Sequence, residues 1–149
     1  MFKSLLGIKW IPVNQDLSLL ALRLIAVTSL LLKHGLEKTI GFSQMYAMTA
    51  AHPMDPIGIG PLPTLLYAAF ADGICTVLMI AGLATRWAAL FSFINIAVAW
   101  AFVHHFQFFG RQADHGELIV LYLAVMIGLF LAGAGKYSVD ALLAGSDSR

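Results

Sequence analysis

The sequence predicts an all-α integral membrane protein, a four-helix bundle that forms a single domain over residues 1–149. Of its 149 residues, 60% are apolar and only 11% are charged, whereas a soluble domain has about 45–50% apolar and about 25% charged residues. The apolar residues also come in four long runs, and a helix needs roughly 20 such residues to cross about 30 Å of hydrocarbon. This composition excludes a water-soluble globule, and its high hydrophobicity excludes a disordered chain.

The four runs give the expected helix boundaries. Membrane spans are helical by default because lipid offers no partner for free backbone groups, and these runs are too continuous for the alternation of a membrane barrel. The longest connection has a first half, residues 42–48, that is compatible with an amphipathic helix, and a second half that is rich in proline and glycine and must be irregular. The spans are predicted at about 17–35, 62–83, 87–109 and 117–134, with an outer loop at 36–61.

The distribution of lysine and arginine predicts the orientation. With four spans, the N-terminus, the turn before Trp87 and the C-terminal tail share one side of the membrane. That side holds Lys3, Lys9, Arg86, Lys136 and Arg149, and the other side holds Lys33, Lys38 and Arg111. Because cytoplasmic segments carry the excess of lysine and arginine, both termini are expected in the cytoplasm.

Charge and cysteine content exclude further classes of protein. Nine Lys plus Arg against eight Asp plus Glu give a net charge of +1, with no basic patch to hold the phosphates of a nucleic acid. The single cysteine, Cys75, excludes an internal disulfide, a cysteine-based zinc site and a CxxC redox pair. Nucleic acid is therefore not an expected partner. The expected partners of a chain with these apolar runs are membrane lipid and either a protein subunit or a second copy of the chain.

Two charged residues, Arg23 and Asp72, lie inside predicted spans, where an ionised side chain costs a few kcal/mol. At 1.5 Å per residue, Arg23 lies about 10 Å from the Asp16 end of its span and Asp72 about 16 Å from the Leu83 end of the next one. Because consecutive spans are antiparallel, we expect a buried Arg23–Asp72 ion pair. Such a pair could simply orient two helices, or it could line the path of a small transporter.

A second polar group is predicted at the opposite membrane face. His34 and Lys38 follow the first span, His104 and His105 lie near the end of the third, and Glu117 opens the fourth beside Asp114 and His115, with His52 in the nearby loop. We expect His34, one of the paired histidines and Glu117 to converge on one cavity under the outer loop. Imidazole binds metals and moves protons near neutral pH, but no HExxH or similar spacing is present and no metal site is assigned. A capping role for Glu117 and boundary positions for the histidines explain the same residues structurally.

Several segments, taken together and in order, resemble the DoxX family from about Leu17 to Asp140. The family's first span has an arginine followed by HGxxK, its second has an acid-Gly pair followed by GLxTRxAA, and its closing motif is GPGxYSxD. Asp72 stands where the family usually has Glu, and Ala134 where it usually has Pro. The matching segments are Arg23 with His34-Gly35-Leu36-Glu37-Lys38, Asp72-Gly73, Gly82-Leu83-Ala84-Thr85-Arg86-Trp87-Ala88-Ala89, His104 or His105, Gly116-Glu117 with Tyr122, and Gly133-Ala134-Gly135-Lys136-Tyr137-Ser138-Val139-Asp140.

The resemblance implies a four-helix protein of the bacterial inner membrane with a link to redox chemistry. Some relatives are subunits of thiosulfate:quinone oxidoreductase, and others accompany oxidative-stress or metal-handling systems. Because the family has no single activity, fold transfers better than function. We interpret the chain as a quinone-associated component that receives electrons from a partner subunit, with quinone favoured over haem or a metal ion as the cofactor. A non-catalytic scaffold or anchor is the alternative, and a small transporter is a weaker one.

Overall fold

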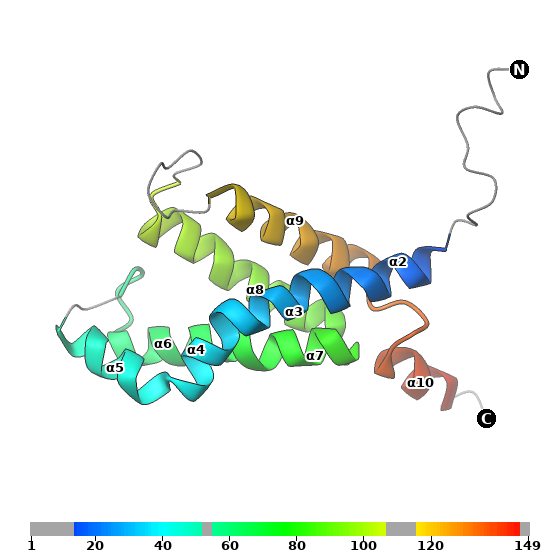
Figure 1. Ribbon diagram of the computed structural model, residues 1–149, viewed down its shortest axis with the longest axis horizontal. Helices are drawn as coiled ribbons and strands as arrows, with labels where there is room; N and C mark the ends of the chain where they lie inside the picture. The colour runs from blue at the N-terminus through cyan, green and yellow to red at the C-terminus, as the bar shows by residue number, and fades with distance from the viewer. Residues whose placement is uncertain (1–13, 52–54, 107–115, 147–149) are drawn as a thin grey trace, which may run out of the picture.

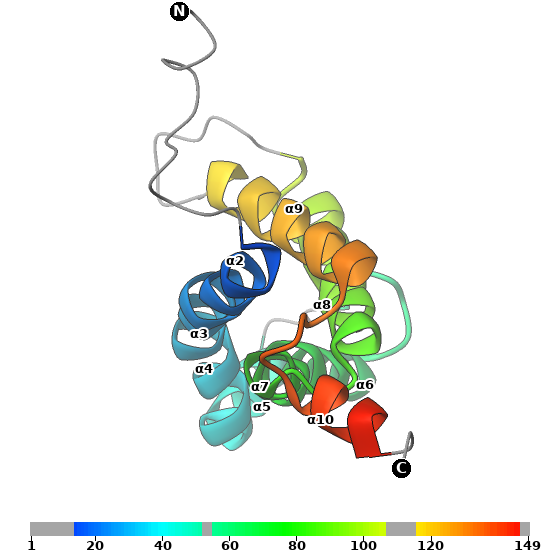
Figure 2. The same ribbon diagram turned by 90° about the vertical axis from the view of Figure 1, so that its right-hand side faces the viewer.

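The computed structural model describes residues 14–51, 55–106 and 116–146, and the regular elements in these ranges are all helices. Three helical rods are long and apolar enough to cross a membrane: Gln15–Ile40, Pro61–Ala81 and Thr85–Val103. A fourth, α9 (Gly116–Ala132), is apolar and has 17 described residues. Figure 2 looks along the rods and shows them around a common axis, with α9 and α8 next to each other.

The first rod is a continuous helix of 26 residues. Asn14 caps its start by accepting a hydrogen bond from the Leu17 N–H at 3.0 Å, which satisfies one of the free donors of a helix N-terminus. The rod runs past the expected end at residue 35 because Leu36–Ile40 holds no helix breaker before Gly41. Its segments are α2 (Gln15–Leu22), the π-helical turn η1 (Arg23–Val27), α3 (Thr28–Leu30), the π-helical turn η2 (Leu31–Gly35) and α4 (Leu36–Ile40).

The connection expected as an outer loop is largely helical. α5 (Phe42–Ala51) covers the stretch predicted to be compatible with a helix, and an irregular segment follows at 55–60. The Asp55 carboxylate holds that segment by accepting from the Ile59 N–H at 2.9 Å and the Gly60 N–H at 2.8 Å. His52 lies outside the described residues.

The second and third rods form a helical hairpin. The second consists of α6 (Pro61–Ala69), the π-helical turn η3 (Phe70–Ile74) and α7 (Cys75–Ala81). A tight turn follows, in which Gly82 and Ala84 have positive φ angles of 74° and 48°. The third rod consists of α8 (Thr85–Val98) and the π-helical turn η4 (Ala99–Val103).

The third rod ends earlier than the sequence predicts. We expected it to reach about Phe109, but its described helix ends at Val103. His105 and Phe106 follow with positive φ angles of 47° and 56°, a left-handed conformation that a right-handed helix cannot continue. Residues 107–115, which include Asp114 and His115, lie outside the described part of the chain.

Apolar side chains fill the space between the rods and also cover the outside. Val27, Met79, Met126 and Leu129 are fully buried members of one core cluster to which all four rods contribute. Large apolar residues such as Ile25, 74% exposed, point away from that core. A protein that is apolar both inside and outside suits a lipid environment.

The rods have two different ends, which we name by what lies there. At the terminal end, on the right in Figure 1, α2 begins and α10 (Val139–Ser146) packs beside the Gly82–Ala84 turn. Asp16 ties this end together by accepting from the Lys136 N–H at 2.9 Å. At the other end, which we call the α5 end, the first rod passes into α5.

Candidate functional site

A buried carboxylate, Asp72, joins three of the rods. It lies in the middle of η3 and is 2% exposed. Its Oδ2 accepts from the Lys38 ammonium at the end of the first rod, and its Oδ1 accepts from the Asn95 amide of α8 at 2.9 Å. We call these three residues the Lys38–Asp72–Asn95 cluster. Its carboxylate is fully enclosed, whereas the Lys38 side chain stays 21% exposed.

Two glycines let the first and second rods approach closely beside this cluster. A Cβ on Gly35 would collide with the backbone oxygen of Asp72, and a Cβ on Gly73 would collide with the methyl group of Thr39. Small residues at helix contacts permit this kind of approach in membranes. The close crossing brings Lys38, one turn beyond Gly35, within reach of Asp72.

His34 also lies near the cluster. It directly precedes Gly35, is half-buried, and is close enough to interact electrostatically with both Lys38 and Asp72. Imidazole exchanges protons near neutral pH. His34 therefore places a group that can accept and donate a proton one helical turn before Lys38 on the same rod.

The cluster is built on irregular turns of the helices. Asp72 occupies η3, and η2 ends at Gly35. The Thr76 hydroxyl donates to the backbone oxygens of Asp72 and Gly73 at 2.6 and 2.7 Å, which supplies a partner where the helical ladder is displaced. Single π-helical turns occur frequently at functional sites because they redirect a side chain.

Arg23 does not pair with Asp72, so the expected buried ion pair is wrong. Arg23 is fully buried, and its Nη1 donates to the backbone oxygens of Met79 at 3.4 Å and Ile80 at 3.1 Å, while Nη2 donates to that of Tyr137. The Met79 and Ile80 oxygens belong to the last turn of α7, where a helix has free carbonyls and the negative end of its dipole. Arg23 thus caps the C-terminus of α7.

Side-chain direction and depth together explain the error. Side chains on a helix lean toward its N-terminus, and the first two rods are antiparallel. Arg23 therefore leans toward the terminal end, whereas Asp72 leans toward the α5 end. Lys38 leans back along the first rod and meets Asp72. Arg23 and Asp72 also lie at different depths, because the Arg23 guanidinium lies against Gly82 at the end of α7, whereas Asp72 lies against Gly35, twelve residues further along the first rod.

The terminal end is held by a hydrogen-bonded network that we call the terminal clasp, formed by Arg23, Gly82–Thr85 and Tyr137–Asp140. The Asp140 carboxylate caps α8 by accepting from the Ala84 N–H at 2.7 Å and the Thr85 N–H at 3.1 Å. The Asp140 N–H donates to the Gly82 oxygen at 2.9 Å. A Cβ on Gly82 would collide with the Arg23 guanidinium and approach Ser138 within 2.5 Å. The clasp is structural. It accounts for three features of the family resemblance: the arginine of the first span, the segment that begins at Gly82, and the closing segment that ends at Asp140.

The remaining predicted site residues lie elsewhere. His104 follows the end of η4, His105 is exposed in a left-handed conformation, and Glu117 is exposed in the first turn of α9. Within the described ranges, neither His105 nor Glu117 forms a hydrogen bond with Lys38 or Asp72, and no three His, Cys, Asp or Glu side chains could hold a metal ion. The convergence of His34, one of the paired histidines and Glu117 on one cavity stays a prediction.

Sequence reasoning missed the role of Asn95, although a signal was present. At 1.5 Å per residue, Asn95 lies about 15 Å from the start of α8 at Thr85, and Asp72 about 14 Å from the end of α7 at Ala81. The two rods are joined by a tight turn, so these positions have the same depth. A polar amide at the depth of a buried carboxylate predicts a hydrogen bond between them.

Comparison with known proteins gives the family. The family model DoxX matches residues 18–105. A protein from Haemophilus influenzae described as uncharacterized is 31% identical over 124 residues, which cover 81% of this chain and 87% of its own. No solved structure matches the chain. With its long apolar helices, the chain is an integral membrane protein in contact with lipid, and it belongs to the DoxX family.

Proposed function

We propose that the chain is a quinone-associated component of a bacterial inner membrane, in which the Lys38–Asp72–Asn95 cluster binds the quinone head group. The observation that carries this proposal is that the Lys38 ammonium is held by one carboxylate and still has donors free to bind a ligand. An ammonium group has three donors; one is engaged by Asp72, and the side chain remains partly exposed. The two other N–H groups can donate to a quinone carbonyl oxygen.

The cluster also suits proton supply. Reduction of a quinone to a quinol takes up two electrons and two protons, and the protons must reach the carbonyl oxygens. Lys38 can give a proton to such an oxygen while Asp72 and Asn95 hold its side chain in place. His34 lies one helical turn before Lys38 on the same rod, and we propose that it returns a proton to Lys38. The electrons would come from a partner subunit, because lysine, aspartate, asparagine and histidine side chains can transfer protons but are not redox-active.

The proposed arrangement in the membrane has four spans with both termini in the cytoplasm. The fourth span is α9, whose 17 described residues extend about 26 Å at 1.5 Å per residue. The five lysine and arginine residues on the side of the terminal end, against three on the other side, support the orientation. The cluster then lies nearer the outer face than the terminal clasp does.

A membrane anchor without catalysis is the second candidate, and the terminal clasp favours it. Arg23 and Asp140 stabilise the fold through hydrogen bonds to the backbone. Gly82 has no side chain and therefore lets Arg23 and Ser138 pack closely against it. If the Lys38–Asp72–Asn95 cluster has the same purpose, all the polar groups inside the rods stabilise the bundle. The chain would then bind a partner subunit and no quinone.

Quinone binding separates the two candidates. We would reconstitute the protein in nanodiscs of phosphatidylcholine and titrate it with a short-tailed benzoquinone, following the quenching of tryptophan fluorescence. Loss of a hydrogen bond from a charged donor costs about 1.5–3 kcal/mol, so Lys38→Met should weaken binding by roughly 10- to 100-fold. Lys33→Met, which removes an exposed lysine from the same rod, should bind like the wild type.

A folding defect must be kept separate from a binding defect. Lys38→Met leaves the Asp72 carboxylate buried without its cation, whereas the double variant Lys38→Met/Asp72→Asn removes both charges. We expect the double variant to keep the helical circular dichroism of the wild type and still to bind the quinone weakly. If the double variant binds as tightly as the wild type, the cluster is not the quinone site; if the wild type itself shows no saturable quinone binding, the anchor is the correct function.

A further inference from the structure

Two charged residues, Lys33 and Glu37, lie on the outer face of the first rod at the depth of the membrane centre. Both are exposed. They lie two residues before and two residues after Gly35, and a Cβ on Gly35 would collide with the backbone of Asp72. Asp72 occupies the middle of the second rod, Pro61–Ala81. At 1.5 Å per residue, both charges therefore lie within about 3 Å of that middle, measured along the first rod.

The two charged side chains point away from the other rods. Each residue of a helix is turned by roughly 100° from the one before it, so residues two positions before and two positions after Gly35 lie nearly opposite it. Gly35 is buried against the second rod. Lys33 and Glu37 therefore face the hydrocarbon, where an ionised side chain is costly.

Neither charge is neutralised by another described residue of the chain. In the described ranges, no carboxylate lies at ion-pair distance from Lys33 and no cationic group lies at that distance from Glu37. The two residues are four positions apart on one helix with the lysine first, which is the weaker order for an ion pair within a helix. Charged residues inside membrane spans almost always face other protein groups, so we expect another chain to cover this face.

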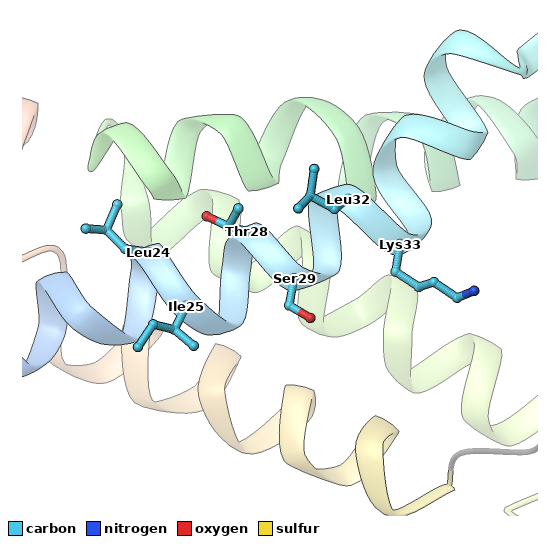
Figure 3. Close-up of a pocket in the computed structure, with 6 residues that line it drawn as sticks. All are labelled: Leu24, Ile25, Thr28, Ser29, Leu32 and Lys33. Atoms are coloured by element: carbon cyan, nitrogen blue, oxygen red, sulfur yellow. The ribbon is translucent and has the colours of Figure 1, made fainter.

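The surface beside these charges has a shape that suits a packed helix. A shallow depression of about 470 Å³ is lined by six residues of the first rod alone. Figure 3 shows the short side chains of Thr28 and Ser29 in its middle, with larger side chains before and after them. Small residues let two helices approach closely in a membrane, and large apolar side chains of a neighbouring helix can enter the depression. The lining residues are Leu24, Ile25, Thr28, Ser29, Leu32 and Lys33.

A second copy of the chain supplies the charges that this face lacks. All copies insert into the membrane in one orientation, so a two-fold axis between two copies runs along the membrane normal and residues at equal depth face each other. Lys33 of one copy and Glu37 of the other are then offset by about 6 Å along the rod, which the flexible four-carbon side chain of lysine can span. The symmetry makes this contact twice, so two ammonium groups and two carboxylates neutralise one another. A different subunit would need both an acidic and a basic group at these depths.

We propose that this outer face of the first rod is the interface of a homodimer, in which Lys33 of each copy pairs with Glu37 of the other. Apolar side chains such as Leu32, 62% exposed, pack around the charges and exclude lipid from them. The interface lies on the side of the rod opposite Asp72, so it is separate from the Lys38–Asp72–Asn95 cluster and does not depend on quinone binding. In a micelle or nanodisc that holds one copy, Lys33→Met removes only an exposed charge.

Reversing one charge at a time tests the pairing between copies. Copies labelled at the C-terminus with a donor or an acceptor fluorophore are reconstituted together in phosphatidylcholine vesicles, and energy transfer is measured as the protein is diluted with lipid. Lys33→Glu gives a dimer interface with four carboxylates, and Glu37→Lys gives one with four ammonium groups. Like charges that face each other across an interface are strongly unfavourable, so each variant alone should associate at least about tenfold more weakly than the wild type.

A mixture of the two variants should regain the energy transfer of the wild type, because each chain then meets opposite charges on the other. A Lys33–Glu37 pair within one chain cannot produce this recovery, since each variant chain carries charges of a single sign at these positions. The recovery also shows that both variants are folded. Lys136→Met removes an exposed lysine at the terminal end and should leave the association unchanged.

Disulfide cross-linking locates the interface in a chain that keeps both charges. Leu32→Cys places a thiol at equal depth on both copies and should form a disulfide-linked dimer on oxidation, whereas Val77→Cys, 52% exposed on α7, should stay monomeric. The native Cys75 is buried and is left in place. The proposal is wrong if the wild type shows only the energy transfer of unassociated copies, if the mixed variants do not regain it, or if Val77→Cys cross-links as readily as Leu32→Cys.

Discussion

The pairing of Lys38 with Asp72 predicts that removing one partner harms the protein more than removing both. Asp72 is enclosed, with 3% of its side chain exposed, while Lys38 retains 21%. Lys38→Met leaves a buried carboxylate with only the Asn95 amide as a side-chain partner, and stranding a buried charge costs about 3–5 kcal/mol. Asp72→Asn should cost less, about 1.5–3 kcal/mol, because Lys38 can turn toward its exposed side and only a charged hydrogen bond is lost.

The double variant Lys38→Met/Asp72→Asn has no stranded charge and should recover about 2–3 kcal/mol relative to Lys38→Met. Reversible unfolding of the protein in mixed micelles, followed by circular dichroism, gives the four free energies of a double-mutant cycle. Lys33→Met is the matched control, and its exposed side chain predicts a change within about 0.5 kcal/mol. A double variant no more stable than Lys38→Met would refute the pairing.

The other predictions concern the helix contacts and the terminal clasp. Gly35→Ala and Gly73→Ala each place a methyl group against the neighbouring rod and should lower the unfolding free energy by about 1–3 kcal/mol. Gly128→Ala is the control: no atom lies within 4 Å of the added carbon, so this variant should raise the unfolding free energy by up to about 1 kcal/mol. Equal effects of the three variants in the same unfolding assay would contradict the close crossing. Asp140→Ala removes the cap of α8 and should lower the unfolding free energy by about 1–2 kcal/mol, which a lower melting temperature reports. The loss of stability is compared with that of Asp55→Ala, which removes a carboxylate from the irregular segment. Arg23→Leu leaves the oxygens of Met79, Ile80 and Tyr137 without this donor and should cost about 1–3 kcal/mol for each oxygen that stays buried and unpaired; if its effect depended on Asp72→Asn in a double-mutant cycle, the assignment of separate partners would be incorrect.

The course of the chain could be predicted from its sequence because lipid imposes a simple length rule. Apolar runs gave three helices close to their observed places, and the helix-compatible part of the outer loop is α5. The end of the third rod could not be predicted. Its apolar composition continues past Val103, and the left-handed residues His105 and Phe106 carry no mark in the sequence.

Lys38, Asp72 and His34 of the candidate site could be predicted, but the role of Asn95 and the pairing of the side chains could not. Arg23 and Asp72 were singled out because charged residues in spans are costly, and His34 and Lys38 because they belong to a polar group at one membrane face. Pairing Arg23 with Asp72 by their distances from the helix ends failed, because Gly35 and not Arg23 is level with Asp72 and because side-chain direction along antiparallel helices also decides which groups meet. The π-helical turns that carry Asp72 and Gly35 follow from packing between the rods and have no local sequence signature.

The central claim is that Lys38 of the Lys38–Asp72–Asn95 cluster donates a hydrogen bond to a quinone, and the carbonyl vibration of the bound quinone tests it most directly. A short-tailed benzoquinone labelled with carbon-13 at its carbonyl groups can be followed by infrared difference spectroscopy in nanodiscs. The carbonyl band should lie at lower frequency in the wild type and in Lys33→Met than in lipid alone, and should return to the lipid value in Lys38→Met/Asp72→Asn. A band at the same frequency in all three proteins would contradict the claim.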